Sequence, residues 1–330
     1  MIEGVGLDIG TNMLVSASID DSGSVSYKKQ RDAFYRIKPK SDIHSKSIKH
    51  YLNSSNCNYM VENNEFIIIG EEALRMANDR NDNAKRPMSK GVISASEKSS
   101  IPMLKVLLEN IIGKGDSTPL VFSIPAEPVT DKFDIFFHKN MLEGYIKELG
   151  FVPESMNEAF AIAYSELLDD GLSGLTLSFG AGMVNICLCY NGDPISEFSI
   201  TRGGDWIDTQ VGYAVDENPS FIQIEKEYDG GVDLINPINN LHNAISMYYK
   251  VLVDYVIDVM SVKFEKYNLP YFREPLPIVL SGGLSLAKGF DLIFEDSLSR
   301  TKLPFEVSGV RLAKDPMTAV AHGCLMAAIL

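Results

Sequence analysis

The sequence predicts an α/β protein with two lobes and a ligand cleft between them. The length of 330 residues suits two domains or one bilobed one, and a hydrophobic share of 45% is enough to fill sizeable cores. A strand, a glycine turn and a second strand open the chain within residues 4–18, and the same order returns within residues 175–189. This internal echo predicts a strand-rich core and a glycine turn in each half.

The first hairpin carries residue types suited to a phosphorylated ligand. Its turn is GTN at residues 10–12. The glycine lets the backbone approach a ligand closely, and the next two side chains can donate hydrogen bonds. The backbone amides of the turn can form an anion-binding nest. Asp8 ends the first strand, where a carboxylate can hold a hydrated divalent cation beside phosphates. Alone, this hairpin is equally typical of plain turn chemistry, but the second hairpin, turning at residues 180–182, favours a polyphosphate gripped from both sides.

The remainder of the first half alternates strands with helices. A polar stretch over residues 30–80 is interpreted as a small inserted subdomain. Apolar periodicity predicts helices over 96–112 and 130–149, with a buried strand at 119–124 between them. The inner stripe of the second helix is expected to comprise Phe133, Phe137, Met141, Tyr145 and Leu149.

The second half is expected to continue with helices around the repeated hairpin. A helix of small residues begins after Glu158, and an apolar strand at 278–280 ends in two glycines. Between them, a long amphipathic helix starts near Asn239. Its apolar stripe is predicted to consist of Leu241, Ile245, Tyr248, Leu252, Val256 and Val259.

Composition and charge disfavour several function classes. The formal net charge of −14 argues against binding to nucleic acid or to anionic lipid. The four cysteines lack CxxC spacing and the five histidines lack ligand spacing, which disfavours a zinc site. No apolar run is long enough to cross a bilayer, and with a first strand near Gly4 we expect neither a signal peptide nor a membrane anchor. A location in the reducing cytoplasm is therefore expected.

Five motifs, in order along nearly the whole chain, resemble those of the actin-like ATPase superfamily. LDIGTN at residues 7–12 resembles the first phosphate loop, and SFGAGMVN at 178–185 resembles the second. NEAFAIAY at 157–164 resembles the first connecting helix. The adenosine loop is represented by LSGGLSLAKGF at 280–290, and the second connecting helix by DPMTAVAHG at 315–323.

The last two motifs are most similar to those of the bacterial actins, the group that includes MreB and MamK. GEEALRM at residues 70–76 and RGGDWID at 202–208 also have bacterial-actin counterparts. No single motif is decisive, but five motifs in register make the resemblance specific.

The resemblance implies a two-lobed actin-like (ribonuclease H-like) fold with a nucleotide cleft between the lobes. Lobe I would span residues 1–156, with the inserted subdomain at about 30–80, and lobe II would span 157–314. A C-terminal helix within 315–330 would return to lobe I. The outer subdomain of lobe II, at about 208–240, is shorter than in bacterial actins, which predicts helices alone there and an altered filament contact.

The resemblance also implies a site for ATP and Mg²⁺. Glu158 stands where the superfamily keeps the group that orients the attacking water, and Asp8 would hold the cation through water. The other residues implied to bind the nucleotide are Gly10, Thr11, Asn12, Ser178, Gly180, Ala181, Gly182, Gly203, Gly204, Asp205, Lys226, Glu227, Gly282, Gly283, Leu284 and Ser285.

Several of these residues have a plain structural alternative. Lys226 and Glu227 are equally typical of a solvated charge run. Glu158 suits a helix N-terminus because the helix dipole favours an acid there. Gly282 and Gly283 suit a simple turn from strand to helix.

Two positions depart from the superfamily pattern. Ser178 stands where the second phosphate loop normally begins with Asp, and Asn185 stands where Asp, Glu or His is usual. A neutral hydroxyl is a weaker partner than a carboxylate for the water shell of magnesium, so slow hydrolysis is expected.

By resemblance, the chain would bind ATP, hydrolyse it slowly and assemble with copies of itself into cytoplasmic filaments. One alternative is a nucleotide-binding scaffold or regulator with little hydrolysis, which Ser178 favours. A chaperone-type ATPase is disfavoured because no substrate-binding domain follows the last helix. A small-molecule kinase is disfavoured because no added segment offers an acceptor-site base. Polymerisation rests on family analogy alone.

Overall fold

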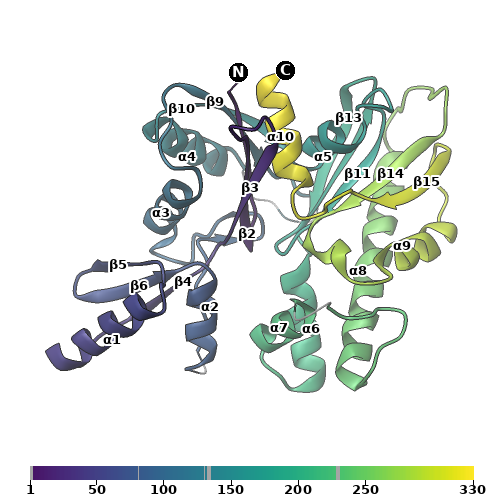
Figure 1. Cartoon of the computed structure of the whole chain (residues 1–330). Helices are drawn as coiled ribbons and strands as arrows, with labels where there is room; N and C mark the ends of the chain where they lie inside the picture. The colour runs from purple at the N-terminus through teal and green to yellow at the C-terminus, as the bar shows by residue number, and fades with distance from the viewer. Residues whose placement is uncertain (1–2, 81, 130, 132–134, 228–230) are drawn as a thin grey trace.

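Two five-stranded sheets form the frame of the molecule (Figure 1). The computed structural model describes residues 3–80, 82–129, 131, 135–227 and 231–330. The first sheet has the strand order β10-β9-β1-β2-β3, made of β1 (Val5–Ile9), β2 (Met13–Ile19), β3 (Val25–Arg31), β9 (Thr118–Ile124) and β10 (Phe151–Asn157). The second has the order β13-β12-β11-β14-β15, made of β11 (Gly174–Phe179), β12 (Val184–Tyr190), β13 (Asp193–Ile200), β14 (Leu276–Ser281) and β15 (Val307–Leu312).

The two sheets share one plan. In the first, β1 pairs antiparallel with β2 and parallel with β9. In the second, β11 pairs antiparallel with β12 and parallel with β14. The internal echo read from the sequence is thus confirmed as a repeated sheet topology, and each glycine turn lies at the same place in its sheet.

Two helices of small residues lie between the sheets and pack on each other. They are α5 (Glu158–Glu166) and α10 (Ala319–Ile329), and α10 also packs on β1. A Cβ atom on Gly323 would lie 1.7 Å from the Ala161 carbonyl oxygen, and one on Gly6 would lie 2.0 Å from the Ala321 carbonyl oxygen. Glycine is required at both places because the backbones touch. Gly4, near the start of the described chain, lies against Ile329 at the end of α10 (Figure 1).

A small three-stranded sheet extends the first half. It has the order β4-β6-β5 and is made of β4 (Phe34–Ile37), β5 (Tyr59–Glu62) and β6 (Glu65–Ile69), flanked by α1 (Asp42–Ser54) and α2 (Glu71–Asn78). Helix α1 was not among the elements expected from the sequence. That helix buries only Ile48 and Leu52 of its 13 residues, so its polar sequence hides its periodicity.

The remaining helices of the first half are α3 (Ser100–Ile112) and α4 (Ile135–Glu148). α3 begins at Ser100, later than the expected start at 96. Residues 130 and 132–134, where the second helix was expected to begin, lie outside the described residues. The predicted inner stripe of α4 is correct for Tyr145 and Leu149 but wrong for Phe137, whose side chain is 55% exposed. A strict four-residue spacing drifts around a helix of 3.6 residues per turn, so the buried face runs through His138 and Leu142 instead. Phe133 lies outside the described residues.

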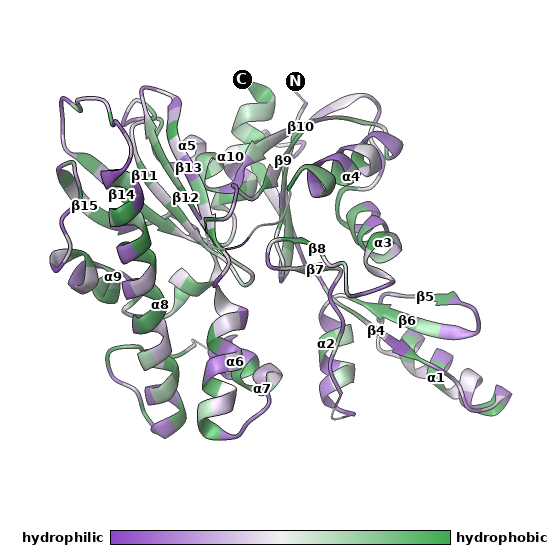
Figure 2. Cartoon of the chain, turned by 180° about the vertical axis from the view of Figure 1, so that it is seen from behind, coloured by the Kyte–Doolittle hydropathy of each residue, from purple (hydrophilic) through white to green (hydrophobic). Residues whose placement is uncertain are grey.

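The outer part of the second half is helical. Between β13 and β14 the described residues form α6 (Gly204–Val215), α7 (Pro219–Glu227) and α8 (Asn240–Glu265), and no strand. After β14 come the 3-10 helix η1 (Gly283–Leu286) and α9 (Phe290–Ser299). Strands β11 and β12 of the second sheet are mainly hydrophobic, while α1 and α2 mix polar and apolar residues (Figure 2).

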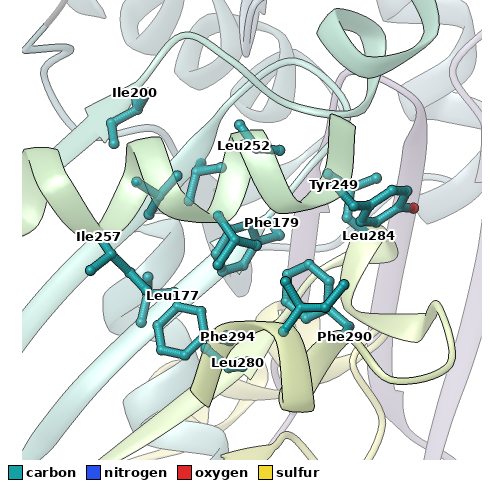
Figure 3. Packing of buried hydrophobic residues seen from close by; sticks show 14 of the residues in the cluster. Leu177, Phe179, Ile200, Tyr249, Leu252, Ile257, Leu280, Leu284, Phe290 and Phe294 are labelled. Carbon is teal, nitrogen blue, oxygen red and sulfur yellow. The ribbon is translucent and has the colours of Figure 1, made fainter. Parts of the chain in front are cut away.

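The largest core lies between the second sheet, α8 and α9. Phe179 of β11 meets Phe290 and Phe294 edge-on, with ring centroids 4.9 and 6.2 Å apart (Figure 3). The predicted stripe of α8 is confirmed as packed against this core, with Ile245, Leu252 and Val256 buried and Leu241, Tyr248 and Val259 partly buried. Tyr249, which the predicted stripe did not include, is buried as well. None of the described helices is both long and apolar enough to span a lipid bilayer.

Candidate functional site

A cavity of about 490 Å³ lies between the two sheets. Its walls come from both glycine hairpins, the start of α5, the helices α6 to α8 and the turn after β14. Residues far apart in the chain therefore face one space.

The two glycine hairpins are built alike. The Gly10 amide donates to the Met13 carbonyl oxygen at 3.0 Å, and the Gly180 amide donates to the Met183 carbonyl oxygen at 3.0 Å. The tips approach closely, because a Cβ atom on Gly182 would lie 2.5 Å from Thr11 Oγ1. Two short backbone turns from different lobes can thus surround an anionic ligand without side chains between.

A third hairpin, formed by β7 (Met88–Ser89) and β8 (Val92–Ile93), reaches the same place. The Gly91 amide donates to Thr11 Oγ1 at 2.9 Å, and a Cβ atom on Gly91 would collide with Met183 Sδ at 2.6 Å. Sequence reasoning missed this element. The turn pair Lys90-Gly91, between Met88-Ser89 and Val92-Ile93, was the available signal.

Asp8 and Glu158 are the buried acids of the cavity. Ser123 Oγ donates to Asp8 Oδ1 at 2.8 Å, and burial raises the pKa of Asp8 to about 6. Burial, and next the charge of Asp8, raise the pKa of Glu158 to about 8. The two predicted catalytic positions therefore lie together, and the charge of Asp8 acts on Glu158.

The side chain of Glu158 is held at both oxygens. Ser178 Oγ donates to Oε1 at 2.5 Å, and Asn185 Nδ2 donates to Oε2 at 2.7 Å. Asn157 caps α5 by accepting from the amide of Ala159 at 2.8 Å, which fixes where Glu158 starts the helix. The two residues that depart from the superfamily pattern are thus both donors to Glu158.

This arrangement fits a hydrated divalent cation. The ion pairs formed by the described residues include neither Asp8 nor Glu158, so no described side chain neutralises these carboxylates. Three or more His, Cys, Asp or Glu side chains arranged for a metal occur nowhere in the described part of the chain. A cation here would therefore take most of its ligands from water and from the phosphates of a bound molecule, as Mg²⁺ commonly does.

The structure requires glycine at Gly282, the first residue after β14, but not at its neighbour Gly283. Gly282 has a φ of +88°, and its Cβ atom would lie 2.5 Å from the Phe179 carbonyl oxygen. A Cβ atom on Gly283 would meet only Met317 Sδ, at 3.7 Å. The backbone demands the first glycine. The second leaves open space in the cavity wall that a ligand can fill.

Lys226 and Glu227 line the cavity but are already paired. Lys226 Nζ lies 2.8 Å from Asp208 Oδ1, and both side chains are more than nine-tenths buried. Arg31 Nη2 lies 2.7 Å from Glu227 Oε2. Burial raises the pKa of Asp208 to about 6, with the Lys226 charge opposing it. A solvated charge run is therefore excluded for Lys226.

Most of the other predicted residues also line the cavity, but two do not. Gly203 and Ser285 are absent from the wall. A Cβ atom on Gly203 would lie 2.5 Å from the Ala181 carbonyl oxygen, and Ser285 Oγ donates to the Gly282 carbonyl oxygen at 2.8 Å. They support the loops from behind, and their contact with a ligand stays a prediction. The cavity-lining residues that the sequence reading missed include Arg31, Asp208, Gln223 and Tyr249.

Comparison with known proteins gives one family and several structures. The family model described as volactin matches residues 4–328. No curated protein matches the chain. A structure of the MamK double helical filament has a TM-score of 0.71 and 18% identity, covering 99% of this chain and 98% of that one.

Two further structures are similar over most of their length. MreB5 of Spiroplasma citri bound to AMPPNP has a TM-score of 0.66 and 16% identity, covering 97% of this chain and 94% of that one. The ethanolamine utilization protein EutJ from Carboxydothermus hydrogenoformans has a TM-score of 0.56 and 14% identity, covering 98% of this chain and 89% of that one. The predicted actin-like fold and the resemblance to bacterial actins are confirmed as a likeness of fold.

Proposed function

The chain belongs to the volactin family, and from that premise we propose that it binds ATP with Mg²⁺ in the cavity and assembles with its own copies into filaments. The proposal includes slow hydrolysis of the bound ATP. The proposal also includes the division of the chain that the sequence predicts, with lobe I at 1–156, lobe II at 157–314 and a returning C-terminal helix at 315–330.

The observation that carries the proposal is the pair of facing glycine hairpins around two buried acids. The Gly10 and Gly180 turns present backbone from both lobes, and the open space at Gly283 adds room for a nucleoside. No described side chain neutralises the charges of Asp8 and Glu158. The hydrated cation that accompanies a bound polyphosphate would supply the positive charge that balances them. Bound AMPPNP in the similar MreB5 structure supports the same ligand class for this cavity.

The roles of the residues follow from their contacts. Asp8, fixed by Ser123, would hold the water shell of the cation. Glu158 would orient a water against the terminal phosphate, because phosphoryl transfer depends mainly on positioning and electrostatics. Magnesium, when bound, neutralises developing charge on the phosphates. Ser178 and Asn185 would keep the Glu158 carboxylate in one orientation.

The same contacts favour a second candidate, a nucleotide-binding scaffold with little hydrolysis. Both oxygens of Glu158 already accept hydrogen bonds from Ser178 and Asn185. A carboxylate with both oxygens engaged has fewer lone pairs left to accept a proton or a hydrogen bond from water. The filament proposal stands in either case, because assembly needs the bound state and not turnover.

Self-assembly is proposed from the fold likeness to a protein seen as a double helical filament. A head-to-tail contact that does not close gives an open polymer. Assembly without nucleic acid or anionic lipid as a partner agrees with the net charge of −14, and we place this assembly in the cytoplasm as part of the proposal.

The direct test measures ATP binding and polymer mass together. We expect calorimetry to detect ATP–Mg²⁺ binding, and sedimentation and negative-stain microscopy to show filaments only when nucleotide is present. Gly283→Val should abolish binding, because the side chain would enter the cavity. Gly309→Val is the matched control, since a Cβ atom on Gly309 would meet nothing within 4 Å and Gly309 is exposed on β15, away from the cavity. Equal binding by both variants would place the nucleotide elsewhere.

A further inference from the structure

Tyr249 and its neighbour Tyr248 on α8 have different surroundings. The Tyr249 side chain is 3% exposed, and its ring meets Phe290 edge-on with centroids 6.1 Å apart. Tyr248 packs against Trp206 with centroids 5.9 Å apart and does not line the cavity, whereas Tyr249 does. The predicted apolar stripe contained Tyr248, so the place of Tyr249 in the cavity wall was not foreseen.

The hydroxyl of Tyr249 lacks a partner in the part of the chain that the structure describes. It takes part in no hydrogen bond there, and it is not among the fully enclosed polar atoms that lack one. A tyrosine this deeply buried normally hydrogen-bonds its hydroxyl group. In Figure 3 the oxygen lies at the rim of the apolar cluster and points away from Phe179. The hydroxyl therefore opens into the cavity.

The chemistry around this hydroxyl suits a polar, uncharged group of a ligand. Burial raises the pKa of Tyr249, and the charges of Asp208 and Glu227 raise it further, so the hydroxyl stays protonated. A neutral phenol can both donate and accept a hydrogen bond. Leu284 of η1 lies beside it in the same apolar cluster and offers an apolar surface (Figure 3).

Tyr249 lies apart from the groups proposed to meet the phosphates. The charges that act on its hydroxyl are those of Asp208 and Glu227, on α6 and α7, and not those of Asp8 and Glu158. Asp208 and Glu227 are each ion-paired, with Lys226 and Arg31, so this part of the wall offers no unpaired positive charge to an anion. The nucleoside is the part of a nucleotide that combines an apolar face with neutral hydrogen-bonding groups.

We propose that Tyr249 is a specificity-determining residue whose hydroxyl hydrogen-bonds the nucleoside part of the bound nucleotide. This rests on the proposed nucleotide function and deepens it. The shared chemistry is one neutral hydrogen-bonding group, which either the edge of the base or a sugar hydroxyl can supply. A phenylalanine would fill the core equally well, so the hydroxyl is the part that discriminates.

The test compares Tyr249→Phe with the parent by titration calorimetry, using ATP, inorganic tripolyphosphate, 2′-deoxy-ATP and 3′-deoxy-ATP. Loss of one neutral hydrogen bond should weaken ATP binding by roughly threefold to tenfold. Tripolyphosphate affinity should not change. If the contact is to the base, both deoxy nucleotides lose affinity as ATP does. If it is to a sugar hydroxyl, one deoxy nucleotide binds the variant and the parent equally.

Tyr248→Phe is the matched control and should bind every probe like the parent. Equal ATP affinity in the Tyr249→Phe variant and the parent would overturn the inference while leaving the proposed function intact. The inference would also be overturned if the Tyr249→Phe variant lost as much affinity for tripolyphosphate as for ATP, or if Tyr248→Phe weakened ATP binding equally. Either result would mean that the substitution disturbs the cavity as a whole and not a contact with the nucleoside. A parent that binds ATP nowhere overturns the proposed function and this inference together.

Discussion

Arg31 and Glu227 join the two halves of the molecule across the cavity. Arg31 Nη2 donates to Glu227 Oε2 at 2.7 Å and Nη1 donates to Oε1 at 3.2 Å, which links β3 to the end of α7. Asn12 Nδ2 also donates to Glu227 Oε1 at 3.1 Å. A second link joins Arg86 Nη1 to Asp205 Oδ1 at 2.7 Å. The lobes are thus held by polar contacts that water can replace when they separate.

Glu227→Gln is expected to release nucleotide faster than the parent, by roughly threefold to tenfold, because it removes a charged hydrogen bond that closes the cleft. The partial exposure of Glu227 limits the effect, and added salt should reduce it. Stopped-flow release of a fluorescent ATP analogue measures the rate.

Asp296→Asn is the control for that measurement, because Asp296 pairs with Lys250 inside one lobe. It should leave release unchanged. A Glu227→Gln rate equal to that of the parent would show that the lobes open elsewhere.

A second prediction concerns Asp32, which is fully buried near Arg86, the residue that links the lobes through Asp205. Neither of its carboxylate oxygens has a hydrogen bond of good geometry, and burial raises its pKa from 3.8 to about 8, with the Arg86 charge opposing. The folded protein thus keeps a proton that the unfolded chain releases above about pH 4. Its contribution to stability is complete below that pH and is lost as pH rises toward about 8, at up to about 1.4 kcal/mol per pH unit.

Asp32→Asn removes this titration, so the variant should gain stability over the parent as pH rises from about 5 to about 8. Thermal unfolding of both proteins across this range measures the difference. Parallel pH profiles would mean that Asp32 does not titrate in this window.

A third prediction tests the helix junction. Gly323→Ala should destabilise the fold by about 1–3 kcal/mol or more, because its Cβ atom would lie 1.7 Å from the Ala161 carbonyl oxygen. Gly144→Ala, in the middle of α4 with nothing within 4 Å of its Cβ atom, should instead stabilise by about 0.5–1 kcal/mol. Denaturant unfolding compares the two, and equal effects would contradict the close crossing of α5 and α10.

The features predicted correctly from the sequence are those formed by residues that are close together in the chain. The two glycine hairpins were recognisable because strand, turn and strand follow one another directly and then repeat. Glu158 was recognisable because the helix that it starts is a short local motif. Ser178 and Asn185 stood out as departures, but their shared contact with Glu158 was not visible.

The sequence could not predict contacts between distant segments. Arg86 and Asp205 are 119 positions apart, and Arg31 and Glu227 are 196 apart, so no local pattern pairs them. Tyr249 and Tyr248 are adjacent and chemically identical, and only the rotation of α8 against the second sheet decides which one reaches the cavity.

The last prediction concerns Ser178, where the structure changes the expectation drawn from the superfamily pattern. From the motif alone, an aspartate at 178 should help by ordering the water shell of magnesium. In the structure, Ser178 Oγ donates to Glu158 Oε1 at 2.5 Å. An aspartate would replace this donor by a third carboxylate beside Asp8 and Glu158, and carboxylates that share a site cannot all ionise readily. Ser178→Asp should therefore slow phosphate release roughly tenfold to a hundredfold.

Single-turnover phosphate release is the measurement. Ser178→Asn, which keeps a donor, should stay near the parent rate, and Glu158→Gln should lose nearly all activity while ATP affinity changes little. If Ser178→Asp is faster than the parent, the aspartate serves magnesium as the motif implies, and the hydrogen bond to Glu158 is not what orients the water. If Glu158→Gln hydrolyses as fast as the parent, Glu158 is only the first residue of α5, and the scaffold function becomes the better description of this cavity.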